Sequence, residues 1–105
     1  MSLVKQVPFG QTGMKISPII VGCMSYGSKE WFPWCLEDED KIFEILKFCY
    51  DNGLRTFDTA NAYSNGKSER ILGKFFEEVK HQQRNRGYHD QGIFSQWMRY
   101  WACLI

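Results

Sequence analysis

The chain has 105 residues and a mass of 12.4 kDa, a length that fits a single small domain. Hydrophobic residues make up 44% and aromatic residues 16%, which excludes a disordered or collagen-like chain. The net charge of +1 gives no strong attraction to a nucleic acid or a membrane surface. This average combines two unlike parts. Residues 1–79 carry nine Lys and Arg against eleven Asp and Glu, whereas residues 80–105 carry four against one.

The absence of a visible targeting signal and the spacing of the cysteines both predict a cytoplasmic protein. The N-terminus shows no apolar stretch typical of a secretory signal. The longest apolar run, Pro18–Val21, is far shorter than the roughly 20 residues that cross a bilayer. The cysteines are scattered without a C-x-x-C pair, which favours free thiols over a disulfide framework or a metal site. They are Cys23, Cys35, Cys49 and Cys103.

The first predicted element is a hairpin. Its arms, Val4–Gly10 and Met14–Pro18, flank the turn Gln11–Gly13. Gly13 suits a left-handed conformation in such a turn. Pro8 cannot donate a hydrogen bond to a ladder, so we expect the first arm at a sheet edge.

Strands and helices alternate after the hairpin. The mostly β-branched run Ile19–Gly22 predicts a fully buried parallel strand, and residues 26–37 are expected to form a loop. The segment Leu54–Thr59 predicts a second short strand. Alternation of strands with helices is typical of an α/β fold with a parallel sheet and helices packed outside it.

Two helices fill the gaps between these segments. Asp38 is a candidate N-cap for the first helix, and Asn52 with Gly53 is a candidate stop. Ser68 is a candidate cap for the second helix. Apolar residues at helical spacing predict the buried faces. They are Ile42, Ile45, Leu46 and Cys49 in the first helix, and Ile71, Leu72, Phe75, Phe76 and Val79 in the second.

Candidate functional residues follow the two strands. Gly22, Cys23 and Met24 follow the first strand, and the segment Asp58–Tyr63 follows the second. Functional residues concentrate at the carboxyl ends of parallel strands, so Asp58 and Tyr63 could form a pair in one pocket, in which one group acts as the acid and the other orients it. A tyrosine hydroxyl with an ordinary pKa of about 10 becomes a useful proton donor when a neighbouring cation lowers that pKa.

The same residues also allow purely structural interpretations. Asp58 could cap a turn or pair with Arg55, and Tyr63 could serve packing alone. Gly22 could provide only a tight turn. The sequence has no Rossmann or Walker spacing and no cluster of metal ligands, so no metal site is predicted. At this level the sequence indicates an α/β fold and leaves the function open.

Two longer strings resemble a known family. They are K-Q-V-P-F-G-Q-T-G-M-K-I-S-P-I-I-V-G-C-M over residues 5–24 and F-D-T-A-N-A-Y-S-N-G-K-S-E over residues 57–69. Together they resemble the start of the aldo-keto reductases, above all the yeast and fungal members. The resemblance covers about residues 3–79.

The resemblance implies a TIM (β/α)8 barrel, of which this chain carries the floor hairpin and the first two βα units. It implies NADP(H) as cofactor and a small carbonyl compound as substrate. The family's catalytic Asp matches Asp58, which also lies at the cofactor, and its general-acid Tyr matches Tyr63. The segment near the nicotinamide matches Gly22, Cys23 and Met24.

Residues 80–105 depart from the family pattern. We expect a domain over residues 1–79, followed by a poorly ordered tail outside the family. Read one base later, the codons of Tyr88–Gln91 can encode Ile-Met-Thr-Lys, a string that the family carries in its third strand. We therefore interpret the tail as an out-of-frame reading of a reductase gene. The family's catalytic Lys would then fall at Gln91, and its catalytic His would lie beyond residue 105.

The expected function is that of a truncated NADP(H)-dependent aldo-keto reductase that is inactive as a 105-residue polypeptide. Two alternatives stay open. One is a non-catalytic module that docks on full-length relatives by strand complementation. The other is a small binding protein with a basic tail. No nucleic acid and no membrane are expected as partners of the reductase.

Overall fold

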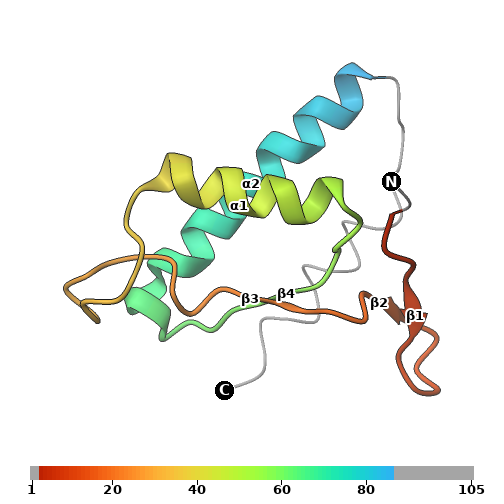
Figure 1. The fold of residues 1–105 in the computed structure, drawn as a ribbon, viewed down its shortest axis with the longest axis horizontal. Coiled ribbons are helices and arrows are strands. Elements are labelled where there is room, and N and C mark those ends of the chain that lie inside the picture. The colour runs from red at the N-terminus through yellow and green to blue at the C-terminus, as the bar shows by residue number, and fades with distance from the viewer. Residues whose placement is uncertain (1–2, 87–105) are drawn as a thin grey trace.

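The computed structural model describes residues 3–86, and it begins with the expected hairpin (Figure 1). Strand β1 (Val7–Pro8) pairs antiparallel with β2 (Lys15–Ile16), with Val7 opposite Ile16. Gly13 in the turn has φ of 77°, the left-handed conformation that the sequence predicts. Most of the tail expected after residue 79, including Gln91 and Cys103, lies outside the described residues.

A buried serine fastens the hairpin to the rest of the fold. The backbone N–H of Ser17 donates to Thr56 Oγ1 over 2.9 Å, and its hydroxyl accepts a hydrogen bond from the backbone N–H of Arg55. The same hydroxyl donates to Gln6 Oε1, whose side-chain amide donates to the carbonyl of Gly53. The hairpin is therefore anchored just before the second parallel strand begins.

The two predicted parallel strands are present and neighbouring. Strand β3 (Val21–Gly22) pairs with β4 (Phe57–Asp58), with Gly22 opposite Asp58. The prediction of a fully buried first strand is wrong at its start, because Ile19 is 62% exposed and Ile20 is 49% exposed. Within the described residues, α1 and α2 both lie on one side of this strand pair (Figure 1), and these two side chains remain open to solvent.

Helix α1 (Glu39–Asp51) begins and ends as predicted. The Asp38 carboxylate accepts hydrogen bonds from the backbone N–H groups of Asp40 and Lys41, two of the four donors that a helix start leaves unsatisfied. The helix stops before Gly53, whose φ is 97°. A Cβ atom at this glycine would lie 2.7 Å from a backbone atom of the N-terminal arm, so glycine is needed for space as well.

The apolar face of α1 is narrower than predicted. Ile42 and Leu46 are fully buried, and Cys49 is half-buried. Ile45 is 42% exposed, so its assignment to the core is wrong. A helix turns by 100° per residue, which places residue 45 at the flank of the stripe formed by residues 42, 46 and 49.

Helix α2 (Lys67–Asn85) begins without a side-chain cap, so the prediction that Ser68 caps it is wrong. Its N-cap is Gly66, and Ser68 lies inside the first turn. The Ser68 hydroxyl is fully buried, donates to the carbonyl of Cys23 over 2.8 Å and lies 2.9 Å from Thr59 Oγ1. The Ser68 hydroxyl therefore forms hydrogen bonds with residues distant in the sequence and does not cap its own helix.

The core lies between the two helices and the β3–β4 pair (Figure 1). All five apolar residues predicted for α2 pack in or against it, and α2 continues past residue 79. None of the helices within residues 3–86 is long and apolar enough to cross a membrane. The buried apolar residues are Val21, Cys23, Tyr26, Cys35, Ile42, Leu46, Phe57, Ile71, Leu72, Phe75 and Val79.

Burial of Cys23 makes stability depend on alkaline pH. Burial, with the nearby Asp58 charge as the second cause, raises the pKa of the Cys23 thiol from 9.0 to about 12. The unfolded chain therefore loses this proton first, and the free energy of unfolding should fall as the pH rises from about 9 to about 12. Urea titrations at several pH values across this range measure the free energy of unfolding of the wild type and of Cys23→Ala. The difference between the two proteins near pH 7 is the reference. Relative to it, Cys23→Ala should lose less stability than the wild type as the pH rises. Parallel pH profiles would contradict this prediction.

Candidate active site

The two sequence segments singled out as functional meet at one edge of the strand pair. Gly22 lies opposite Asp58, and the backbone N–H of Cys23 donates to the carbonyl of Asp58 over 2.9 Å. Both segments follow the carboxyl ends of parallel strands (Figure 1). Gly22 and Met24 are exposed there, and Asp58 is half-buried. The fold thus brings together residues that lie more than thirty positions apart in the sequence.

Cys23 differs from its two neighbours because its side chain belongs to the core. Its thiol is fully buried and lies 3.5 Å from the carbonyl oxygen of Val21. Its own carbonyl accepts from the Ser68 hydroxyl and from the backbone N–H of Tyr26. Cys23 therefore shapes the end of β3, and the free surface comes from Gly22 and Met24.

Tyr63 lies on a tight turn that links β4 to α2. It is the first residue of a short 3-10 helix, η1 (Tyr63–Gly66), and its backbone N–H donates to the carbonyl of Ala60 over 3.2 Å. Ser64 and Asn65 have φ of 48° and 53°, left-handed values that cost a non-glycine residue about 1 kcal/mol each. The turn that carries Tyr63 is therefore held in an unfavourable conformation by its surroundings.

An aromatic cluster that sequence reasoning missed lies beside Tyr63. Its members, Trp31, Phe32 and Trp34, belong to the loop between β3 and α1. The Phe32 and Trp34 rings stack with centroids 5.1 Å apart, and the Trp31 ring lies 5.9 Å from the Tyr63 ring. The signal in the sequence is the run W-F-P-W in a loop that follows a parallel strand, where binding residues concentrate.

The alternative pairing of Asp58 with Arg55 is not among the ion pairs of residues 3–86. The Arg55 guanidinium stacks on the Tyr50 ring, 3.9 Å from its centroid, and donates to the carbonyls of Tyr50 and Leu54. Arg55 is therefore used on the helix side of the strand pair. The Asp58 carboxylate is left at the strand end.

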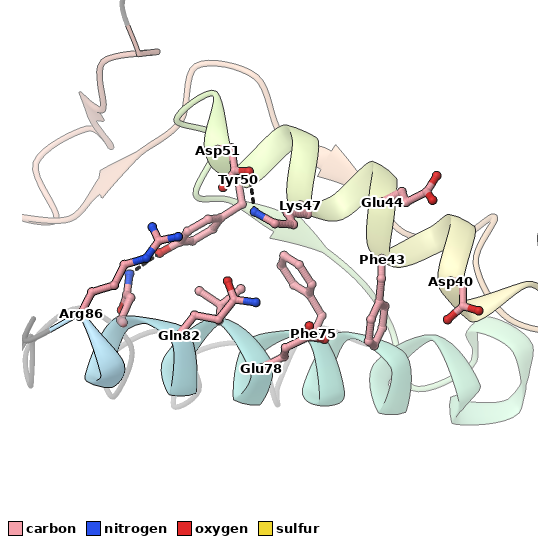
Figure 2. Close-up of a pocket in the computed structure, with 12 residues that line it drawn as sticks. Asp40, Phe43, Glu44, Lys47, Tyr50, Asp51, Phe75, Glu78, Gln82 and Arg86 are labelled. Carbon is pink, nitrogen blue, oxygen red and sulfur yellow. Dashed lines mark hydrogen bonds and ion pairs between the residues drawn. The ribbon is translucent and has the colours of Figure 1, made fainter.

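A groove of about 560 Å³ lies between α1 and α2 (Figure 2). Phe43, Tyr50 and Phe75 form its apolar part. Charged residues of both signs border the groove. Among them, Lys47 Nζ and Asp51 Oδ2 form a salt bridge over 2.7 Å. All lining residues come from the two helices or lie directly after α2, and none of the candidate site residues is among them.

The surface at the strand end is open beside Gly22. A Cβ atom at Gly22 would meet nothing within 4 Å, so the surface beside the strand end is open. Asp58 lies opposite Gly22 in the strand pair, and Met24 follows two residues after Gly22 in the chain. In the part of the chain from residue 3 to residue 86, no group of three or more His, Cys, Asp and Glu side chains could hold a metal ion.

Several fungal proteins of known name are similar in sequence to this chain. A protein of Saccharomyces cerevisiae named as an aryl-alcohol dehydrogenase is 65% identical over 77 residues, which is 73% of this chain and 22% of the relative. A second protein with that name, from Schizosaccharomyces pombe, is 57% identical over 72 residues, 68% of this chain and 20% of the relative. The versiconal hemiacetal acetate reductase of Aspergillus parasiticus is 49% identical over 65 residues, 62% of this chain and 19% of that protein.

The chain spans about a fifth of the length of these curated relatives. The sequence model of the Aldo/keto reductase family matches residues 18–89, which is more than half of the chain. The match includes both strand-end segments and continues past residue 79. The resemblance seen in the two sequence strings is thereby confirmed, and the chain belongs to the aldo/keto reductase family.

Proposed function

We propose that this chain is the N-terminal part of an NADP(H)-dependent oxidoreductase that reduces a carbonyl group to an alcohol. Its hairpin and its β3–α1 and β4–α2 units would form the first part of a TIM barrel. The observation that carries the proposal is the register of Gly22 opposite Asp58. This register brings the segment matched to the nicotinamide site and the segment matched to the catalytic Asp and Tyr to the same edge of the sheet, where barrel enzymes have their active sites.

The chain's own residues would act on the carbonyl oxygen. When bound, NADPH supplies the hydride that adds to the carbonyl carbon. The Tyr63 hydroxyl donates its proton to the carbonyl oxygen, which leaves the alcohol as product. Asp58, at the end of β4, would hold the ammonium of the family's catalytic lysine, at whose position this chain carries Gln91, and so keep a positive charge near the tyrosine hydroxyl. Gly22 and Met24, with Cys23 holding the strand end between them, would border the nicotinamide.

An aryl carbonyl compound is the substrate class that fits best. Two of the similar proteins are named as aryl-alcohol dehydrogenases. The exposed rings of Phe32 and Trp34, with Trp31 against Tyr63, offer stacking surface beside the proposed proton donor. Aromatic side chains bind aryl groups by offset or edge-to-face contact.

A chimeric enzyme tests the proposed role of Tyr63. Residues 1–79 of this chain would replace the matching segment of the Saccharomyces cerevisiae relative. The rate of NADPH-dependent reduction of 4-nitrobenzaldehyde by this chimera would then be measured. The chimera should be active, and Tyr63→Phe should lower kcat by at least about 100-fold because the proton donor is lost. Tyr50→Phe, a change between α1 and α2, is the matched control and should leave kcat unchanged. Full activity of the Tyr63→Phe chimera would refute the proposed role.

The 105-residue polypeptide by itself should be inactive. It carries the proposed Asp and Tyr but no Lys at the matching position, where Gln91 stands. Without that ammonium, the proposed mechanism lacks the positive charge that would assist proton transfer from the Tyr63 hydroxyl. Purified polypeptide mixed with NADPH and 4-nitrobenzaldehyde should oxidise NADPH no faster than buffer, with the active chimera as positive control. Measurable turnover would contradict this expectation.

The gene itself tests the interpretation of the tail. If residues 80–105 arise from an out-of-frame reading, the codons of Tyr88–Gln91 should read Ile-Met-Thr-Lys one base later. Sequencing of the genomic DNA and the transcript across the Lys80 codon measures this directly. Codons that give a different string in that frame would rule the interpretation out.

A further inference from the structure

We propose that Ser64 is a positioning residue that fastens the β3–α1 loop to the turn carrying Tyr63. Through this contact it sets the Trp31 ring against the tyrosine. The inference rests on the proposed function of Tyr63 as proton donor, since only then does the placement of its ring bear on a reaction. The contact itself is a separate structural claim.

The contact between the loop and the turn is close and specific. Ser64 is a polar residue only 4% exposed, and its Oγ accepts a hydrogen bond from the backbone N–H of Ser28 over 3.0 Å. The preceding Gly27 passes directly over it. A Cβ atom at Gly27 would lie 2.1 Å from Ser64 Oγ and 2.3 Å from Ser64 Cβ, distances that real Cβ atoms do not show. Only a glycine lets the loop approach this far.

The turn is held from both ends. Ser64 and Asn65 keep left-handed backbone conformations, which a non-glycine residue adopts only when its surroundings compensate. The Ser28–Ser64 hydrogen bond secures the start of the turn. The buried Ser68 hydroxyl, bonded to the carbonyl of Cys23, secures the first turn of α2 that follows.

The two ends of the loop are joined to each other, so the contact with Ser64 at residues 27 and 28 anchors the whole loop. A bridge pairs Tyr26 with Leu36, and two backbone hydrogen bonds, Gly27 N–H to Leu36 and Leu36 N–H to Ser25, join the loop's two ends. The aromatic cluster lies between these ends, and Figure 1 shows the loop against the start of α2. Fastening the loop at Gly27 and Ser64 therefore brings Trp31 to Tyr63.

The first test uses the full 105-residue chain and NMR. In the wild type, the Ser28 amide should be protected from hydrogen exchange, and nuclear Overhauser effects should connect the Trp31 and Tyr63 rings. Ser64→Ala should raise the exchange rate of that amide by about tenfold and remove the ring contacts. Ser25→Ala, in the same loop, is the matched control and should change neither. Ring contacts that persist in Ser64→Ala would overturn the proposal.

A second variant blocks the contact by its bulk instead of by removing the acceptor. Gly27→Ala should also separate the Trp31 and Tyr63 rings, while Gly10→Ala, a positive-φ site in open space, controls for backbone strain alone. Protection of the Ile42 and Leu46 amides reports whether α1 stays folded. If both Ser64→Ala and Gly27→Ala unfold α1, the contact is a general stability element, and the positioning role is refuted.

Kinetics of the chimeric enzyme separate this inference from the proposed function. Ser64→Ala should lower kcat for the aryl aldehyde by about tenfold and leave the KM for NADPH unchanged, because misplacement affects the reacting groups and not the cofactor surface. An inactive chimera with the NMR results as expected would refute the proposed function alone. An active chimera whose kcat is insensitive to Ser64→Ala would refute the positioning role alone.

Discussion

The parallel pairing of β3 with β4 is the constraint on which the other features of this chain depend. A pair of parallel strands is weak by itself and is stabilised mainly by the helices that connect and cover it. Here α1 crosses from the end of β3 to the start of β4, and its Ile42 and Leu46 pack with Phe57 and Phe75 in one core. The register of this pair then determines which polar residues meet at the strand ends.

Buried serines secure the pair at its two ends. Ser17 binds the backbone and side chain of residues 55 and 56 just before β4, and Ser68 binds the carbonyl of Cys23 just after β3. Both are fully buried, and a buried hydroxyl is costly unless it is hydrogen-bonded. No buried side-chain polar atom of residues 3–86 lacks a hydrogen-bond partner. The polar residues inside this small core therefore define the geometry of the strand ends.

The string F-D-T-A-N-A-Y-S-N-G-K-S-E divides its residues between folding and the candidate site. Phe57 packs in the core, while Asp58 stands at the strand end. Tyr63 lies on a strained turn, Ser64 docks the neighbouring loop, and Ser68 connects α2 to β3. A motif of this kind is specific because neighbouring positions must meet unrelated physical demands at once.

Local rules were sufficient for much of the backbone. The N-cap at Asp38, the stop at Gly53 and the left-handed Gly13 follow from hydrogen-bond donors and steric freedom within a few residues. They were confirmed for that reason. The same rules failed at Ser68, because a buried partner far away in the sequence competes for its hydroxyl, and at Ile45, because periodicity does not say how wide a covered face is.

The sequence by itself determined the family and the order of strands and helices, and it led to the prediction of Asp58 and Tyr63 as site residues, since these depend on residue type and spacing. Only the tertiary structure decided that Cys23 faces the core and that Gly27 lies on Ser64. It alone placed Trp31 beside Tyr63. Each of these facts depends on the packing of segments that are distant in the chain, and packing is set by the shape and hydrogen bonds of the folded whole.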